Sequence, residues 1–245
     1  MEIAIVIPAR FKSSRFPGKP LANILGKPLI IWVAQLCENA IGKKNVYIAT
    51  DDSSIANVVE RHGFKKIMTS SNCLTGTDRV AEASNKIDAE IIINVQGDEP
   101  LVDPEDIKKI IKEKQNNPDA VICGYSKITA PEKPEDLNIC KVIFNENNNL
   151  IYASRAPLPG SKDHINKPKN YFKQVCIYAF NRNELEKFFN YSRKSYLESF
   201  EDIEIIRFLE WGQEVRMIET SSSSIAVDNP EDILKVENFI KNINA

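Results

Sequence analysis

The sequence predicts a three-layer α/β protein built around a mostly parallel sheet. Three observations support this prediction. Short runs rich in Ile and Val alternate with helical patterns through the first half of the chain. These runs are apolar on both faces, which is typical of strands that helices cover on each side. A repeated order of strand and helix favours parallel pairing of the strands.

Each element of the first half follows from that alternation. Buried strands are expected over residues 2–7, 46–49, 90–95 and 120–125, where apolar residues follow one another. Helices are expected over residues 29–40, 53–62, 77–86 and 104–115, where apolar residues recur at helical spacing. Aspartate or threonine stands near the start of several of these segments and can cap a helix there.

The second half begins with strands that have no long helix between them. They are expected over residues 140–144, 149–154 and 173–180, so we predict a small antiparallel excursion within residues 137–180. Residues 157–170 are rich in Pro, Gly, Lys and Asn, and predict an exposed loop that reaches a neighbouring subunit or folds over a site. Helical spacing returns in residues 196–211 and 230–243, with a strand over residues 214–218 between them.

The composition is that of an ordinary folded protein. Of the 245 residues, 42% are apolar and 27% are charged, and the net charge is -2. These values exclude a disordered chain and a broad basic surface for nucleic acid. The first apolar run is short and ends in proline, so neither a signal peptide nor a spanning helix is expected. We expect one domain over residues 1–245 that acts in the cytoplasm.

The five cysteines form no C-x-x-C pair, and the chain has only two histidines. Neither a zinc site nor a disulfide framework is therefore predicted. Buried free thiols are the expected state of the cysteines.

A basic loop follows the first predicted strand. Residues 8–20 read PARFKSSRFPGKP and hold four cations within ten residues. Ligands bind at the carboxyl ends of parallel strands, and this loop begins at such an end. Arg10, Arg15 and Lys19 can neutralise roughly three to four negative charges of a polyphosphate. The loop matches neither the Walker A pattern nor the dinucleotide pattern, and a solvated basic loop is the alternative.

Two aspartates also follow apolar runs. Asp98 lies in the run NVQGDEP after the strand expected over residues 90–95, and Asp228 lies in the run VDNPED. Carboxylates placed in this way can hold Mg²⁺ between phosphate oxygens. Each residue also has an ordinary interpretation, because Asp98 could be a turn residue and Asp228 could cap the last helix.

Two further motifs are less specific. Arg155 ends a predicted strand, where it could bind a substrate carboxylate with two hydrogen bonds or form a surface salt bridge. Gly76 and Arg79 lie at the start of the helix expected over residues 77–86. They could contact a base or a phosphate, or belong to an ordinary capped helix start.

Taken together and in this order, the motifs resemble the 3-deoxy-manno-octulosonate (Kdo) cytidylyltransferases, which make CMP-Kdo. The likeness covers nearly the whole chain and includes residues 8–10, 14–20, 76–79, 94–100, 154–155 and 227–232. It implies a GT-A-like nucleotidyltransferase fold and a homodimer. It also implies magnesium-dependent transfer of CMP from CTP to the anomeric 2-hydroxyl of Kdo or of a close 3-deoxy-ulosonate such as 8-amino-Kdo. Pyrophosphate is the other product, and in Gram-negative bacteria the reaction feeds lipopolysaccharide biosynthesis.

The resemblance implies roles for residues at matching positions. Those expected to bind CTP are Ala9, Arg10, Arg15, Lys19, Gly76 and Arg79. The expected magnesium ligands are Asp98 and Asp228, which with Arg15 and Lys19 form the expected catalytic set. The residues expected to bind the sugar acid are Gln96, Arg155, Gln174, Tyr178 and Glu204. No general base is assigned, because Mg²⁺ on the attacking hydroxyl would lower the pKa of that hydroxyl.

Two positions depart from the family's usual pattern. Gln174 stands where a histidine is common, and Ile205 stands where a glutamine is common. Both changes would alter hydrogen bonds to the sugar, and a site built around one hydroxyl or amine discriminates strongly when its partner changes. The acceptor therefore stays open, and a CMP-sialic-acid-type synthetase is the alternative. A GT-A glycosyltransferase is a weaker alternative, because it normally carries an Asp-x-Asp motif.

Overall fold

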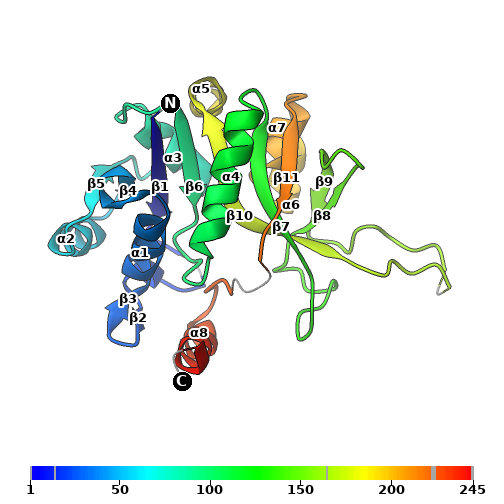
Figure 1. Cartoon of the computed structure of the whole chain (residues 1–245), viewed down its shortest axis with the longest axis horizontal. Coiled ribbons are helices and arrows are strands. Elements are labelled where there is room, and N and C mark those ends of the chain that lie inside the picture. Colours follow the sequence, from blue (N-terminus) through cyan, green and yellow to red (C-terminus); the bar gives the residue numbers. More distant parts are fainter. Residues whose placement is uncertain (1, 14, 164, 222–224, 244–245) are drawn as a thin grey trace.

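A nine-stranded sheet runs through the protein, with helices on both of its faces (Figure 1). The computed structural model describes residues 2–13, 15–163, 165–221 and 225–243. The main path of the sheet has the order β11-β7-β10-β6-β1-β4-β5. Its strands are β1 (Ile3–Ala9), β4 (Val46–Thr50), β5 (Lys65–Met68), β6 (Ile91–Val95), β7 (Val121–Lys127), β10 (Phe172–Asn181) and β11 (Val215–Glu219).

Most strand pairs on this path are parallel, as predicted. β1 pairs in parallel with β4 and with β6, β4 pairs in parallel with β5, and β11 pairs in parallel with β7. The exception is β10, which runs antiparallel between β6 and β7. The carboxyl ends of β1, β6, β7 and β11 and the amino end of β10 therefore reach the same edge of the sheet.

The two faces of the sheet are buried under different helices. Along β1, Ile5 and Ile7 join one core cluster, while Ala4 and Val6 join the other. This alternation explains why the strand is apolar at every position, because neither face meets water. One face packs against α1 (Leu29–Ile41), α2 (Ser53–Arg61) and α4 (Pro104–Asn116), and the other against α3 (Gly76–Ser84), α5 (Arg182–Tyr191) and α7 (Ile206–Glu210).

A hairpin lies beside the main path. β8 (Lys141–Phe144) and β9 (Leu150–Ser154) pair in antiparallel fashion, which confirms the first two strands of the predicted excursion. Asn145 closes their turn, because its side chain accepts hydrogen bonds from the amides of Asn147 and Asn149. The third strand of the excursion, β10, is antiparallel as expected, but it lies within the main sheet between β6 and β7. It also pairs with β8, at Lys173 and Lys141.

The helices of the second half differ from the prediction in two places. The helix expected over residues 196–211 is two helices, α6 (Tyr196–Glu201) and α7, because Asp202 adopts a left-handed conformation with φ 53°. α5 was not predicted, although Asn181 and Glu184 form a capping box at its start. β5 was also missed, because it is an edge strand in which Ile67 is the one buried residue.

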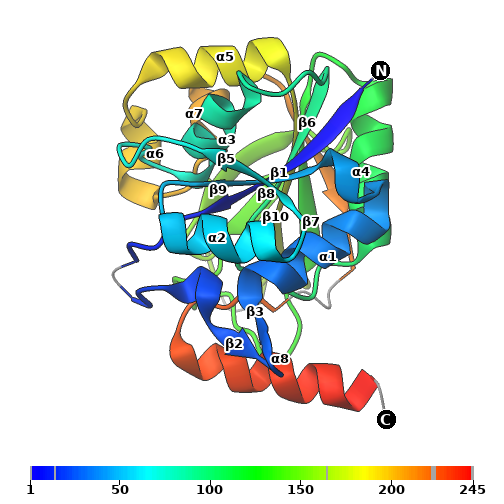
Figure 2. The same cartoon turned by 90° about the vertical axis from the view of Figure 1, so that its left-hand side faces the viewer.

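The last helix packs away from the sheet. α8 (Pro230–Ile243) lies beside the short hairpin of β2 (Asn23–Ile24) and β3 (Lys27–Pro28) (Figure 2). Val236 and Ile240 of this helix share a core cluster with Ile24, Leu29 and Val227. Within the described ranges, none of the helices combines the length and the hydropathy needed to span a membrane.

Candidate functional site

An open cleft of about 520 Å³ lies at the sheet edge where the parallel strands end. Residues from distant parts of the chain form its walls. The predicted site residues among them are Ala9, Arg10, Arg15, Lys19, Gly76, Arg79, Gln96, Asp98, Arg155, Glu204 and Asp228. The structure thus brings together nearly all of the residues that the sequence singled out.

Two acidic and two basic side chains meet in this cleft. Lys19 Nζ lies 2.7 Å from Asp98 Oδ2 and 3.8 Å from Asp228 Oδ1. Arg15 Nη2 lies 3.0 Å from the same Asp228 oxygen. The formal charges of the four groups cancel. The Asp228 carboxylate thus faces Arg15 and Lys19 of the basic loop. The capping role at the start of α8 belongs to Asp232, which accepts hydrogen bonds from the amides of Asp228 and Asn229.

Backbone contacts hold the two aspartates side by side. The Val227 amide donates a hydrogen bond of 2.9 Å to the carbonyl oxygen of Asp98. Lys19 Nζ donates to the Val227 carbonyl at 2.8 Å. The basic loop is fixed by Gly18, which has φ 71° and donates its amide hydrogen to the Phe11 carbonyl. Ser14 of this loop lies outside the described residues.

Gly97 lets the loop after β6 lie against the end of β1. A Cβ atom at this position would lie 2.8 Å from the Pro8 carbonyl oxygen and 3.2 Å from Ile30 Cδ1. Real Cβ atoms do not approach a backbone oxygen this closely, so only glycine fits without a shift. Asp98 follows directly, and this close approach therefore sets where its carboxylate lies.

The pair Asp98 and Asp228 fits a magnesium ion. Carboxylate oxygens are ligands that Mg²⁺ prefers, and the ion usually takes one or two carboxylates plus substrate phosphates. One cation, the Lys19 ammonium, already lies near both carboxylates. Across the described part of the chain, no group of three or more His, Cys, Asp or Glu side chains is arranged to hold a metal. The remaining ligands of an ion at this pair would therefore come from the nucleotide and from water.

The start of α3 forms another wall of the cleft, and Glu204 closes it. The Glu204 carboxylate accepts hydrogen bonds from the Gly76 amide at 2.9 Å and from the Thr77 amide at 2.8 Å. Burial raises the pKa of Glu204, and the hydrogen bonds from Thr77 and Gly76 oppose that rise. A Cβ at Gly76 would lie 2.7 Å from Gln96 Nε2, so a larger residue there would displace the end of the Gln96 side chain.

Two arginines of the cleft are held by the protein itself. Arg79 is 3% exposed, and its Nη2 atom lies 3.3 Å from Asp51 Oδ1. The Arg155 guanidinium donates hydrogen bonds to the carbonyl oxygens of Leu137, Asn138, Glu201 and Asp202. Arg155 lines the cleft, but in this structure its donors face backbone oxygens, so it ties three segments of the cleft wall together.

Three residues expected near the sugar do not line the cleft. Gln174 donates a hydrogen bond of 3.4 Å from Nε2 to Cys123 Sγ. Tyr178 is 4% exposed within a core cluster, where burial raises the pKa of its hydroxyl well above the usual value. Ile205 is 1% exposed. Gln174 contacts Cys123 and Tyr178 packs in the core, so direct contact of either residue with the sugar stays a prediction.

Other residues of the cleft wall were not found from the sequence. They are Cys73, Leu74, Leu137, Asn138 and Asp202. Asn138 accepts a hydrogen bond of 3.2 Å from Arg15. Asp202 lies where α6 ends, and a hydrogen bond from Lys194 holds the pKa of its carboxyl below the usual value. Leu137, Asn138 and Asp202 reach the cleft through packing of α6 and of the segment that Arg155 holds, so no local pattern marks them. Cys73 and Leu74 lie directly before the start of α3.

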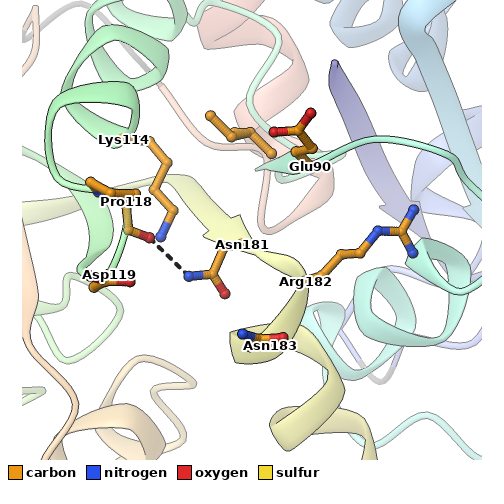
Figure 3. Close-up of a pocket in the computed structure, with 8 residues that line it drawn as sticks. Glu90, Lys114, Pro118, Asp119, Asn181, Arg182 and Asn183 are labelled. Atoms are coloured by element: carbon orange, nitrogen blue, oxygen red, sulfur yellow. Dashed lines mark hydrogen bonds between the residues drawn. The ribbon is translucent and has the colours of Figure 1, made fainter. Parts of the chain in front are cut away.

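A second pocket lies at the opposite end of β6 and has about 260 Å³ (Figure 3). Its polar groups already have partners within the protein. Lys114 Nζ donates to both Glu184 oxygens and to the Ala120 carbonyl, which uses all of its donors. Asn181 Nδ2 donates to the Pro118 carbonyl at 2.8 Å. These contacts fix the start of α5, so this pocket is a weaker candidate for a ligand site than the cleft.

Comparison with known proteins points to one family. The sequence model of a cytidylyltransferase family matches residues 4–220. An 8-amino-3,8-dideoxy-manno-octulosonate cytidylyltransferase of Shewanella baltica (strain OS195) is 37% identical over 243 residues, which are 97% of this chain and 98% of the relative. An enzyme of the same description from Shewanella oneidensis shares the same identity and coverage.

Solved structures agree with this likeness. A CMP:2-keto-3-deoxy-manno-octonic acid synthetase complexed with CTP matches with a TM-score of 0.90 and 34% identity, over 99% of each chain. A putative glucose-1-phosphate thymidylyltransferase from Bacillus anthracis matches with a TM-score of 0.70 at 16% identity, over 99% of this chain and 97% of the other. The second match shows the fold alone, and it confirms the predicted nucleotidyltransferase architecture.

Proposed function

The chain belongs to the cytidylyltransferase family, and we propose that it transfers CMP from CTP to the anomeric 2-hydroxyl of Kdo or of 8-amino-Kdo. The observation that carries this proposal is the cluster of Lys19, Arg15, Asp98 and Asp228 at the cleft. It offers two cations to a triphosphate and two carboxylates to a metal. The structurally similar synthetase complexed with CTP supports the choice of nucleotide.

The parts of the cleft divide between donor and acceptor. Arg10, Arg15 and Lys19 take the triphosphate, and Lys19 offsets negative charge on the departing pyrophosphate. The start of α3, with Gly76 and Arg79, takes the cytidine. Gln96, Arg155 and Glu204 lie along the remaining wall and border the space for the sugar acid.

The reaction is a displacement at the α-phosphorus. The sugar's 2-hydroxyl oxygen forms a bond to phosphorus while the bond from phosphorus to the bridging oxygen breaks, and the hydroxyl proton leaves to solvent. Pyrophosphate departs with the bridging oxygen. Fixed positions and charge neutralisation supply most of the catalysis in such a transfer.

We propose that Asp98 and Asp228 bind Mg²⁺. When bound, Mg²⁺ supplies positive charge against the phosphate oxygens. Asp98→Asn and Asp228→Asn should each lower the rate of CMP transfer by roughly two orders of magnitude, the scale of losing one preorganised electrostatic contact. Asp119→Asn, which changes an exposed aspartate outside the cleft, should leave the rate unchanged. Full activity in both Asp98→Asn and Asp228→Asn would exclude this metal site.

The direct test is pyrophosphate release with Mg²⁺. CTP is compared with the other three nucleoside triphosphates, and Kdo is compared with 8-amino-Kdo and with a sialic acid. Turnover should require CTP together with Kdo or 8-amino-Kdo. The names of the Shewanella relatives favour the 8-amino sugar. Turnover with sialic acid alone would support the alternative synthetase, and a lack of turnover with every acid sugar would refute the proposal.

We also propose that the protein is a homodimer. Ile151 on β9 and Tyr196 and Phe200 on α6 are 58%, 73% and 72% exposed, which is high for large apolar side chains. Light scattering after size exclusion should give twice the mass of 27.7 kDa. A mass of one chain at micromolar concentration would refute it.

A further inference from the structure

Lys19 occupies the space between the two carboxylates that we assign to the metal. Its ammonium contacts Asp98 Oδ2 at 2.7 Å and lies 3.8 Å from Asp228 Oδ1. It also donates to the Val227 carbonyl at 2.8 Å. An ammonium group has three N–H donors, so two are used on Asp98 and Val227. The Lys19 side chain is 16% exposed, which means that these contacts are partly shielded from water.

The charge of this cluster disfavours a bare metal ion. The formal charges of Lys19 and Arg15 cancel those of Asp98 and Asp228, so an added divalent cation would leave a net positive charge. It would also compete with Lys19 for Asp98 Oδ2. A metal bound to a triphosphate brings negative charge with it and offers the ammonium new oxygen atoms. Arg15 contacts Asp228 separately, at 3.0 Å, so Asp228 has a second cationic partner besides Lys19.

We infer that Lys19 is a positioning residue that makes metal binding conditional on the nucleotide. The Lys19 ammonium holds the two carboxylates together and keeps the metal ion out. When a triphosphate binds, it draws the ammonium away from Asp98. Metal and nucleotide then enter as one complex. The inference rests on the proposed function, because that function supplies the triphosphate.

Binding of Mn²⁺ to the whole protein without nucleotide tests this role, with free Mn²⁺ measured by electron paramagnetic resonance. Lys19→Met should bind Mn²⁺ about tenfold more tightly than the unchanged protein, which corresponds to about 1.4 kcal/mol. Lys19→Arg keeps the cation and should behave like the unchanged protein. Lys12→Met removes one charge from an exposed position of the same loop, and should also change nothing. Adding CTP should tighten Mn²⁺ binding to the unchanged protein.

Two further measurements make the result decisive. Lys19→Met combined with Asp98→Asn should lose the gain in Mn²⁺ affinity, because the ligand is removed. Circular dichroism should show that Lys19→Met is folded. The inference is overturned if folded Lys19→Met binds Mn²⁺ no more tightly than the unchanged protein, or if CTP leaves Mn²⁺ affinity unchanged.

The outcomes separate this inference from the proposed function. If Lys19→Met gains Mn²⁺ affinity and CTP tightens Mn²⁺ binding while no acid sugar is turned over, the role of Lys19 stands and the proposed function fails. If the unchanged protein transfers CMP while Lys19→Met gains no affinity, the function stands and the inference fails.

Discussion

Single residues set the position of the charged groups in the cleft. Gly97 brings the loop after β6 against the end of β1, and Asp98 follows it. Lys19 and Val227 then link Asp98 to the segment before α8. The site therefore depends on backbone contacts between loops as much as on the charged side chains themselves.

Replacing Gly97 should show this dependence. In Gly97→Ala the new Cβ would lie 2.8 Å from the Pro8 carbonyl oxygen, so the loop after β6 must move away from the end of β1. Overpacking of this kind costs about 1–3 kcal/mol. We expect a lower midpoint of thermal unfolding and weaker CTP binding, measured by calorimetry. Gly160→Ala is the matched control, because a Cβ there meets nothing within 4 Å. Equal stability of the two variants would contradict the close approach.

Lys19 and Asp98 were predictable from the sequence because each belongs to a loop that begins at the end of an apolar strand, and such ends meet at one edge of a sheet. Asp228 follows the apolar residues 225–227, which form no strand in the structure. Asp202 and Asn138 were not predictable in this way. They reach the cleft through the break between α6 and α7 and through Arg155, which binds the carbonyl oxygens of both. Those contacts join segments that lie far apart in the chain, and no local pattern encodes them.

At the scale of elements, two helix starts build the cleft. α3 begins with amides that Glu204 binds, and α8 begins beside Asp228. Helix starts leave amide hydrogens without partners inside the helix, so an acidic side chain stabilises them. At α3 this acid is Glu204, which the family resemblance assigns to the sugar. At α8 it is Asp232, for which the sequence predicts no role.

The start of α3 depends on Glu204. Glu204→Ala would leave the amides of Gly76 and Thr77 without this partner, which typically costs about 0.5–2 kcal/mol for a helix cap. We expect a loss of thermal stability and a higher KM for CTP, with a smaller change in kcat. Glu146→Gln, in the exposed turn between β8 and β9, is the control. A rise confined to the KM of the sugar would instead support the direct sugar contact implied by the family resemblance.

The start of α8 should show a pH dependence. Burial acts to raise the pKa of Asp232, but hydrogen bonds from Lys235 and from the amides of Asn229 and Asp228 outweigh it, so the pKa lies below the usual 3.8. A carboxyl with a lowered folded pKa stabilises the fold above its unfolded pKa and loses this effect as the pH falls. Asp232→Asn should therefore cost about 0.5–2 kcal/mol at neutral pH.

Denaturant unfolding of Asp232→Asn and of the unchanged protein across pH measures this effect. The difference in the free energy of unfolding should shrink as the pH falls through and below 3.8. Asp119→Asn, at an exposed position, should give little difference at any pH. A constant difference for Asp232→Asn would show that the loss comes from packing and not from the charge.

The elements that were predicted correctly share strong local signals. α1 and α4 carry apolar residues at helical spacing over 13 residues each, and the structure confirms both. β5 has the sequence KKIM and one buried side chain, so its pairing with β4 decides its conformation more than its own pattern does. The spacing of Asn181 and Glu184 is that of a capping box, which is a local signal for the start of α5.

At the scale of the whole molecule, the cleft unites residues from Pro8 to Asp228. A ligand that binds there connects β1, α3, β6 and the segment before α8. Binding to the folded protein alone stabilises it by mass action, about 2.7 kcal/mol at a hundredfold excess of ligand over Kd. For a chain of this size, that corresponds to roughly 5–10 °C in Tm.

Thermal unfolding should therefore respond to CTP with Mg²⁺. We expect an increase in Tm of that size with CTP and Mg²⁺, and a smaller one with CTP and a chelator. ATP, GTP and UTP with Mg²⁺ serve as controls and should give little change. Equal shifts with all four nucleotides would mean that the cleft binds a triphosphate without recognising the cytosine base.

The sheet order could be predicted only in part. The parallel pairs around β1 follow from the alternation of strands and helices, and the structure confirms them. The place of β10 between β6 and β7 could not be read in the same way, because a strand that follows a hairpin is expected to extend that hairpin. Its pairing with β6 and β7 joins residues far apart in the chain, so long-range contacts decide its place in the sheet.

The antiparallel course of β10 has a consequence for how such enzymes diversify. Because the strand starts at the cleft edge and runs away from it, the chain between β7 and β10 must return to the cleft before the strand begins. That connection lies outside β1, β6 and the segment before α8, which lead to Lys19, Asp98 and Asp228 in the cleft. Relatives can therefore differ in this connection, and with it in the part of the cleft wall formed by Leu137, Asn138 and Arg155, while Lys19, Asp98 and Asp228 keep their places.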